Sequence, residues 1–390
     1  MNNDKSSVPF FQGWKIWVGV LIGLFVVALL FLHYLNSPRF ILAPIGNGTH
    51  AWIDANHNGK VDIGLESDFA VSASGKYKKE AFSDALKQIH WSFHSLFWIC
   101  FAFLFMALRD LFYMIRIRTL TGQSLTWNSA FHVIMLWEFA SAVSPGVMSG
   151  AAVAMFILKK EKIPLGKATV AVMVTAMLDN LFFVLLIPFV FFLFGGELLF
   201  PSGNVNMNSA HWIFWGGFSI ISALFLIFFV TIFIYPTFVS RVFQFLFSIP
   251  FLKRWRNGAL KTAAEIELSS KEMRRFSFFK WLKIIGATFA SWTSRFLVIN
   301  FLLAAFVPLY FKEHVLIFAK QFILWLFMRM SPTPGGSGLA EYAFGELMAP
   351  FGKSVLLILG LAFLWRILSY YSYLIIGAII LPRWLRKKAE

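Results

Sequence analysis

A run of prolines and glycines interrupts two strongly apolar segments in the last quarter of the chain. Residues 330–349 read MSPTPGGSGLAEYAFGELMA. This composition cannot continue a helix, because proline lacks the backbone donor and clashes with the preceding turn, while glycine favours non-helical backbone. In lipid such a break is tolerated only where protein or a water-filled cavity satisfies the backbone polar groups. The stretch therefore predicts a re-entrant or discontinuous helix that lines a site.

A second stretch repeats this pattern in the first half of the chain. The two stretches align when a gap of one residue is allowed. They are SPGVMSGAAVAMF at 144–156 and TPGGSGLAEYAF at 333–344. Breaks in corresponding positions of two halves point to a transporter binding site. Proline and glycine are also frequent in ordinary membrane helices, so a simple kink is the alternative for either break alone.

Apolar runs long enough to cross a membrane recur along the chain. Of its 390 residues 58% are hydrophobic, and this pattern excludes a soluble globular domain. The net charge of +16 comes mainly from loops beside apolar runs, as cytoplasmic faces require. No recognised nucleic-acid motif accompanies the charge, so we expect no nucleic-acid partner. The one cysteine, Cys100, excludes an intrachain disulfide.

The distribution of basic residues predicts the topology. Arg116 and Arg118 precede residues 127–158, and Lys159 and Lys160 follow at their end. By the positive-inside rule both flanks are cytoplasmic, which makes this segment a re-entrant hairpin rather than one kinked span. The same rule puts both termini in the cytoplasm. We therefore expect an all-α polytopic membrane protein, an inverted repeat with two re-entrant Pro-Gly-broken hairpins and about six full spans.

This topology also divides the chain into segments. Residues 1–36 are the N-terminal tail and first span, 37–90 a small extracytoplasmic domain, 91–235 the first membrane half with its inner hairpin at 127–158, 236–282 a basic cytoplasmic segment, and 283–390 the second half with an outer hairpin at 316–350 and a basic tail. The extracytoplasmic domain stands apart from the rest because it is polar and rich in turn residues.

The extracytoplasmic segment contains a candidate calcium loop. Its D-x-N-x-N-G-x-x-D spacing supplies oxygen ligands at the first, third, fifth and ninth positions, with a glycine at the turn. These ligands are Asp54, Asn56, Asn58 and Asp62. Leu65 occupies the twelfth position, where such loops carry a bidentate acid, so an ordinary Asn/Gly turn is the alternative. Apart from this Ca²⁺ we expect no cofactor.

Several charged residues fall at membrane depth, where insertion costs about 2.5 to 3.5 kcal/mol each. They are Glu138, Asp179, Arg295, Arg329, Glu341 and Arg366. Ion pairs that hold helices together are one interpretation, and a binding site is the other. Arg295 and Arg366 favour a site, because guanidinium groups suit bidentate phosphate contact. Arg109 and Asp110 lie near a predicted helix end, where we expect their side chains to snorkel to the interface.

The two breaks add groups that bind anions. The second half-helix of each hairpin begins near Gly146 or Gly338 and would present free N–H groups and a positive dipole end at the midplane. Hydroxyls are available from Ser144, Ser149, Thr333 and Ser337. An anion, phosphate above all, fits these parts better than a cation does. No Ser/His/Asp set, phosphate-binding glycine loop or zinc spacing is recognised, so we do not expect an enzyme.

The same residues resemble a known family. The second half of the chain resembles the C-terminal signature of the flippase-like membrane domain of lysylphosphatidylglycerol synthetases. The residues that carry this resemblance are TPGGSGLAE at 333–341, LWRILSYY at 364–371 and Gly377. The run at 144–146 and Asp179 resemble its N-terminal half, and the resemblance covers about residues 91–385. It implies lipid translocation. By position, the family's central site would include Gly335, Gly336, Gly338, Glu341 and Arg366.

The sequence also departs from this family. Gly150 stands where family members often carry an acid, and no soluble aminoacyl-transferring domain is recognised. Residues 37–90 look like an added outer domain. Substrate identity and lipid synthesis are therefore not carried over.

On this basis we expect a flippase-like protein of the bacterial inner membrane that moves an anionic or aminoacylated phospholipid, or another lipid-linked phosphate. Glu138, Asp179 and Glu341 would pair with the arginines or with the headgroup. No ATP-binding motif is recognised, which leaves passive or ion-driven movement. One alternative is a secondary transporter of a small soluble anion, and another is a non-transporting subunit that docks a lipid- or glycan-modifying enzyme. Expected partners are the phospholipid, the membrane, and a second copy or such an enzyme.

Overall fold

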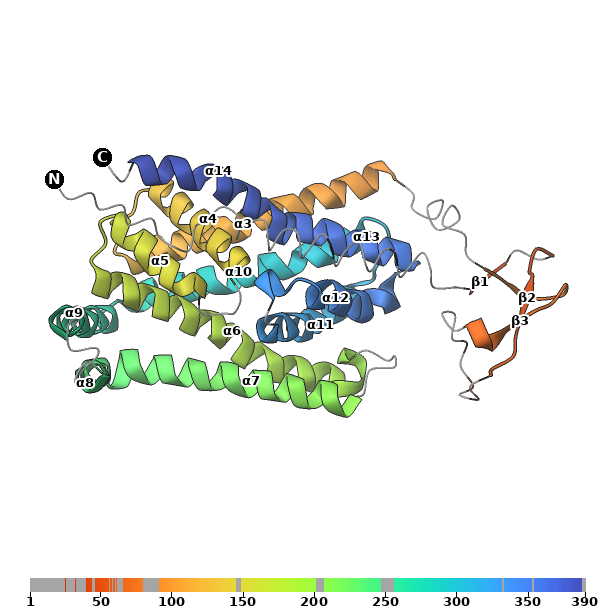
Figure 1. Ribbon diagram of the computed structural model, residues 1–390, viewed down its shortest axis with the longest axis horizontal. Helices are drawn as coiled ribbons and strands as arrows, with labels where there is room; N and C mark the ends of the chain where they lie inside the picture. Colours follow the sequence, from red (N-terminus) through yellow and green to blue (C-terminus); the bar gives the residue numbers. More distant parts are fainter. Residues whose placement is uncertain are drawn as a thin grey trace.

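The computed structural model shows a bundle of long helices with a small sheet beyond one end (Figure 1). It describes residues 25, 32, 40–43, 46–55, 57, 59, 61, 66–79, 91–144, 149–200, 207–246, 256–331, 333–352 and 354–387. Within these ranges, five helices are long and apolar enough to cross a membrane, as a multi-pass membrane protein requires. The additional span that we predict within residues 1–36 lies outside the described residues.

In the described residues of the first half, five helices follow one another along the chain. α3 (Phe93–Leu120) and α4 (Trp127–Val143) begin after Ser92 and Thr126, whose hydroxyls accept hydrogen bonds from the first turns. The remaining helices are α5 (Ser149–Lys160), α6 (Leu165–Leu199) and α7 (Met207–Phe229). A π-helical turn at Val230–Ile234 continues α7.

Two helices, α8 (Thr237–Leu246) and α9 (Arg256–Arg274), connect the first half of the chain to the second half. Its helices are α10 (Phe278–Ala304), α11 (Phe311–Met330), α12 (Leu339–Met348), α13 (Val355–Arg366) and α14 (Ser372–Lys387). A π-helical turn at Ile367–Tyr371 joins α13 to α14 in one continuous helix. Short 3-10 turns at Pro334–Gly336 and Ala349–Phe351 flank α12.

Both Pro-Gly stretches coincide with the ends of helices. α4 ends at Val143 and α5 begins at Ser149, with residues 145–148 outside the described residues. Between α11 and α12, Gly335, Gly336 and Gly338 adopt φ values of 58°, 70° and 92°. These values favour glycine, because a Cβ makes them costly for other residues. α4 packs on α5 and α11 packs on α12, so each break separates two helices that lie side by side.

Gly150 brings α5 close to α4. A Cβ at this position would lie 2.2 Å from the hydroxyl oxygen of Ser141 on α4. A side chain at residue 150 would therefore force the Ser141 hydroxyl to move and would crowd the α4 backbone, because the Cβ would lie 3.3 Å from the Cα of Ser141. This close contact gives a physical reason for glycine at the position where the family that the sequence resembles often has an acid.

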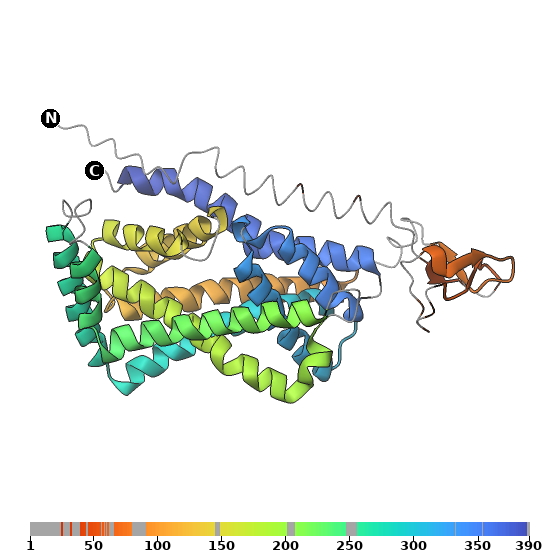
Figure 2. The same cartoon turned by 60° about the horizontal axis from the view of Figure 1, so that its bottom comes forward.

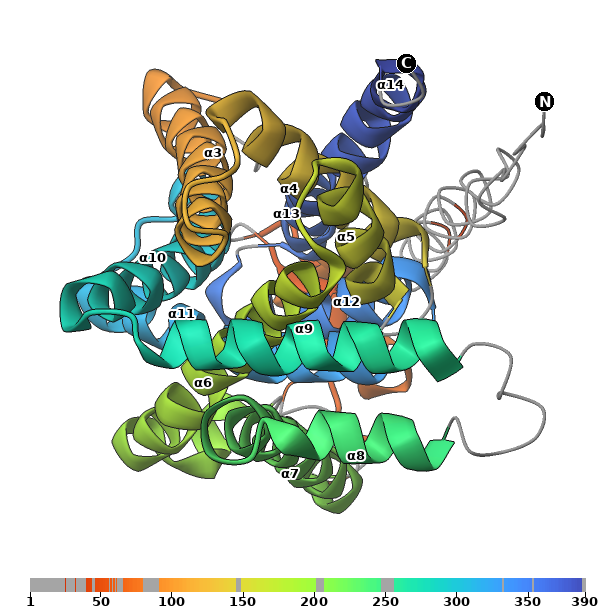
Figure 3. The ribbon, with the colours of Figure 1, turned by 90° about the vertical axis from the view of Figure 1, so that its left-hand side faces the viewer.

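The long helices run along the bundle, whereas α8 and α9 lie across one end of it (Figures 1 and 3). We call this the α8–α9 end; the C-terminal end of α14 lies there too (Figure 1). In the middle of the bundle α3 packs along α10, with the rings of Trp98 and Phe301 stacked at 5.4 Å between centroids. The two halves therefore share one core and do not form separate domains.

The small sheet lies at the opposite end from α8 and α9 (Figure 2). Its strands are β1 (Phe40–Leu42), β2 (His50–Trp52), β3 (Phe69–Val71) and β4 (Tyr77–Lys79), antiparallel in the order β1-β4-β2-β3. Phe40 and Phe69 stack at 4.2 Å and form its core. The sheet falls in the segment that we predict outside the membrane, and it shows that the description all-α is too narrow for the whole chain.

The candidate calcium loop connects β2 to β3. The carboxylate of Asp54 accepts a hydrogen bond of 3.0 Å from the N–H of Gly59 across the turn. The other expected ligands, Asn56, Asn58 and Asp62, lie outside the described residues. The metal prediction is therefore not tested by the described part of the loop.

Gly377 lies where α14 packs on α4. A Cβ at this position would lie 2.3 Å from the Cβ of Phe139, so the two helices would have to separate. We expect Gly377→Ala to lower the free energy of unfolding by about 1 to 3 kcal/mol, as overpacking of a core does. Thermal unfolding of the purified protein in detergent measures this loss.

Gly360→Ala is the matched control for Gly377→Ala. Gly360 lies in α13 with open space where a Cβ would be. Alanine there should be neutral or stabilising by up to about 1 kcal/mol, because it has the higher helix propensity. Equal destabilisation by the two substitutions would contradict the close packing of α14 on α4.

Candidate functional site

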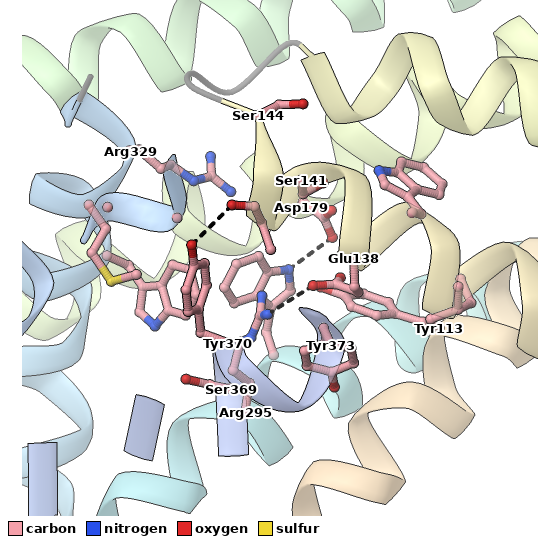
Figure 4. A pocket seen from close by; sticks show the side chains of 18 of the residues that line it. Tyr113, Glu138, Ser141, Ser144, Asp179, Arg295, Arg329, Ser369, Tyr370 and Tyr373 are labelled. Atoms are coloured by element: carbon pink, nitrogen blue, oxygen red, sulfur yellow. Dashed lines mark hydrogen bonds and ion pairs between the residues drawn. The ribbon is translucent and has the colours of Figure 1, made fainter. Parts of the chain in front are cut away.

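A polar cavity of about 270 Å³ lies among the helices of both halves. Its charged lining residues are Arg116, Arg295, Arg329, Arg366, Glu138 and Asp179. Aromatic side chains, among them Tyr113, Trp137, Trp292, Trp325, Tyr370 and Tyr373, form much of the remaining wall. Figure 4 shows side chains from several helices converging on this space. The arginines outnumber the carboxylates, so the cavity favours an anion.

Asp179 on α6 connects three helices. One oxygen accepts a hydrogen bond of 2.6 Å from Arg116 on α3 and another of 2.8 Å from the indole N–H of Trp292 on α10. Arg116 also donates to the hydroxyl of Thr288 on α10, at 3.2 Å. The charge of Asp179 is therefore satisfied within the protein. Its first role in this structure is to hold α3, α6 and α10 together.

Glu138 on α4 belongs to a second ion-pair network. It pairs with Arg109 on α3 and, at 3.4 Å, with Arg295 on α10. Arg109 also donates to Asp110 and to the hydroxyl of Tyr373, each at 2.7 Å. The prediction that Arg109 snorkels to the interface is wrong, because its side chain is fully buried. α3 continues to Leu120, so Arg109 lies inside the helix and points into the bundle.

Arg329 on α11 has a neutral partner where the other arginines have carboxylates. Its guanidinium donates a hydrogen bond of 2.8 Å to the side-chain oxygen of Asn180. It also lies over the ring of Phe183, 4.6 Å from the centroid. In the described ranges no carboxylate lies within ion-pair distance of Arg329. Its positive charge is thus available to a ligand in the cavity.

Arg366 on α13 holds the glycine-rich loop in place. It donates to the carbonyl of Gly335 at 3.0 Å and to the hydroxyl of Ser337 at 3.1 Å, and its Nε lies 2.9 Å from a carboxylate oxygen of Glu341. The other oxygen of Glu341 accepts a hydrogen bond of 2.7 Å from the N–H of Gly338. Arg366 and Glu341 are both almost fully buried. They therefore position the loop and have little capacity left for a ligand.

The predicted anion site at the N-terminus of α12 is wrong in one respect. The N–H of Gly338 is not free, because the carboxylate of Glu341 accepts its hydrogen bond. This is the arrangement in which an acid in the first turn caps its own helix. The negative charge that the dipole favours is thus supplied by the protein, and a phosphate at this helix end would have to displace it.

The structure brings most of the predicted site residues together. Those that line the cavity are Ser144, Asp179, Arg295, Thr333, Gly335, Gly336 and Arg366. Ser337, Gly338 and Glu341 lie behind them in contact with Arg366 or with one another. Gly146 lies outside the described residues, and of Ser149 only the helical backbone is described.

Other lining residues escaped the sequence analysis. Arg116 is the main one, since its position near a basic loop suggested a role in topology alone. Arg109, Tyr113 and Arg116 are spaced four and three residues apart, so they share one face of α3. This spacing in the sequence predicts a polar face of α3 that is directed into the bundle. The hydroxyl oxygens of Ser144 and Thr175 are buried in the cavity wall without a hydrogen-bond partner in the described part of the chain.

Arg366→Gln tests the positioning role of the buried pair. The substitution leaves Glu341 buried without its cation, which should cost about 3 to 5 kcal/mol of unfolding free energy. The double variant Arg366→Gln/Glu341→Gln removes both charges and should recover most of that loss. Thermal unfolding in detergent measures both. A double variant no more stable than Arg366→Gln would show that the ion pair is not what the single substitution breaks.

Comparison with known families identifies the family of the chain. The family described as lysylphosphatidylglycerol synthase TM region matches residues 69–377 of the chain. Comparisons with curated proteins and with solved structures gave no match. The matched range contains both Pro-Gly stretches and all the residues that line the cavity. The chain therefore belongs to the lysylphosphatidylglycerol synthase TM region family, as its sequence resemblance predicts.

Proposed function

We propose that this protein is a flippase-like translocator that carries a lipid with an anionic headgroup across the bacterial inner membrane. The headgroup is that of an anionic or aminoacylated phospholipid or of another lipid-linked phosphate, and no bond is made or broken. The observation that carries the proposal is the excess of arginine over carboxylate around one cavity, with Arg329 left without an acidic partner in the described residues. A phosphate would supply the missing negative charge.

Arg329 and Arg295 are the headgroup-binding residues in this proposal. Arg295 makes only a long contact, of 3.4 Å, to Glu138, and its guanidinium lies 4.5 Å from the ring centroid of Trp325. Arg329 rests on Phe183 in the same way. Aromatic rings hold both guanidinium groups in place without neutralising them. Both therefore keep donors for a phosphate, which guanidinium binds in bidentate fashion.

The proposed path runs through two re-entrant hairpins, α4–α5 and α11–α12. α5 has 12 residues and α12 has 10, whereas a helix needs about 20 to cross the membrane. The glycine-rich loop between α11 and α12 reaches the cavity from one half, and Ser144 at the end of α4 reaches it from the other. Hairpins that meet at a central site suit an inverted repeat with alternating access. In this topology the α8–α9 end and both termini are cytoplasmic.

The family favours a lipid over a soluble anion as the substrate. Its description refers to the membrane region of an enzyme whose product is a lipid. An amphiphilic substrate also explains a polar cavity enclosed by apolar helices, since a headgroup would occupy the cavity while acyl chains stay in the bilayer. A small soluble anion would need only the cavity.

Arg329→Gln tests the proposal directly. This substitution removes a positive charge that has no carboxylate partner among the described residues, and glutamine keeps a polar amide at this position. A charge-assisted hydrogen bond contributes about 1.5 to 3 kcal/mol, so translocation of phosphatidylglycerol should slow by about 10- to 100-fold. Leaflet-resolved transfer of a labelled phosphatidylglycerol in proteoliposomes, at matched incorporation, measures the rate.

Arg386→Gln is the matched control, since it removes one exposed charge at the α8–α9 end and should leave the rate unchanged. Equal rates for Arg329→Gln and the unaltered protein would contradict a role of this cavity in lipid movement. Uptake of inorganic phosphate that depends on Arg329, without lipid transfer, would support a transporter of a soluble anion. No transfer of lipid or phosphate by the intact, folded protein would favour a docking subunit.

A further inference from the structure

A second hollow lies at the junction of α7 and α8, on a different part of the bundle. It is an apolar groove of about 550 Å³, within the range of about 300 to 1,000 Å³ of small-molecule sites. Its apolar lining includes Leu226, Ile227, Val230 and Phe238, and Arg241 is the charged residue among those that line it. None of its lining residues also lines the central cavity. A molecule bound in this groove would therefore not contact the central cavity, where we propose that translocation takes place.

The groove forms where the chain turns from a membrane span into a crossing helix. α7 with its π-helical turn is one of the candidate spans, and α8 runs across the end of the bundle beside α9 (Figure 3). The π-helical turn contributes Val230 and Thr231 to the groove wall. Tyr235 and Pro236 then redirect the chain. The groove thus extends from the apolar part of α7 to the level of α8.

The apolar residues of the groove face outward. Leu226, Ile227 and Phe238 are each more than half exposed, and Phe245 on α8 is 75% exposed. A helix with large apolar side chains and a basic residue, lying at the end of membrane spans, is typical of the membrane interface. At that depth the neighbours of these side chains are lipid acyl chains. The groove therefore offers an acyl chain a fitted surface rather than a flat one.

Arg241 is the charged residue in the lining of the groove, and it favours an anionic headgroup. Arg241 is exposed, and no carboxylate lies within ion-pair distance of it in the part of the chain that the structure describes. Arg274 of α9 reaches the same turn, where it donates to the carbonyl of Phe233 at 3.3 Å. A phosphate or glycerol-phosphate headgroup at the level of α8 would lie between these cations and the solvent. A zwitterionic headgroup would gain less, because its ammonium cancels the net negative charge that attracts the arginines.

We propose that a single phospholipid with an anionic headgroup binds this groove, with one acyl chain between α7 and α8 and its phosphate on Arg241. Three properties of the groove support this occupant: a mostly apolar lining, one basic residue in that lining, and a position at the junction of a span with a crossing helix. Charge complementarity separates it from an ordinary boundary lipid, which any apolar surface would accept.

Photo-crosslinking tests the proposal on the full chain in proteoliposomes. The probe is phosphatidylglycerol with a photoreactive acyl chain, and mass spectrometry of the cross-linked peptides locates it. We expect labelling within residues 226–241 that unlabelled phosphatidylglycerol reduces and phosphatidylcholine of the same chain length does not. Arg241→Gln should weaken this labelling by about fivefold, as loss of one basic residue at a lipid surface does.

Two further variants separate the groove from other effects. Arg383→Gln removes another exposed positive charge, on α14, and should leave the labelling unchanged, and Ile227→Trp should block it by filling the groove. Arg329→Gln should also leave it unchanged, so a failure of the translocation proposal would not touch this one. Equal competition by phosphatidylcholine, labelling insensitive to Arg241→Gln, or no labelling of residues 226–241 would each overturn the proposal.

Discussion

The cost of burying charge inside an apolar bundle determines how the central helices are arranged. Asp179 on α6 satisfies its charge with Arg116 on α3 and Trp292 on α10. Glu138 on α4 does so with Arg109 on α3 and with Arg295 on α10. A carboxylate left alone at this depth would cost several kcal/mol, so α3, α4, α6 and α10 are each held in the one arrangement that pairs these groups. The cavity is the space that this arrangement leaves.

The glycine-rich loop obeys the same constraint at the level of the backbone. The α-helical hydrogen-bond pattern is broken where Gly335, Gly336 and Gly338 take positive φ, and a 3-10 turn restores only part of it. Side chains supply further hydrogen bonds here: Arg366 donates to the carbonyl of Gly335, and Glu341 accepts from the N–H of Gly338. The ion pair between the two side chains satisfies what remains of their charge. A loop with few conformational restraints of its own thereby becomes a fixed wall of the site.

Sequence predicts local breaks well and distant partners poorly. The end of α11 and the start of α12 follow from proline and glycine, which act on their own backbone. The partner of Arg366 does not follow from spacing, because Arg366 meets Glu341 only once the chain has folded back. The sequence leaves open whether Glu341 pairs with an arginine or with the headgroup. Arg109 shows the same limit, since its burial depends on where α3 ends. The small sheet was missed because its strands have three residues each, too few to show periodicity.

The two π-helical turns give a reason why hollows exist beside otherwise regular helices. A π-helical turn inserts an extra residue, so the side chains after it are rotated relative to those before it. In the turn at Ile367–Tyr371, Tyr370 reaches the carbonyl of Ala142 on α4 while Arg366, just before it, faces the glycine-rich loop. The turn at Val230–Ile234 contributes to the groove in the same way. Both turns lie beside a hollow, since Ser369 and Tyr370 line the central cavity and Val230 and Thr231 line the groove.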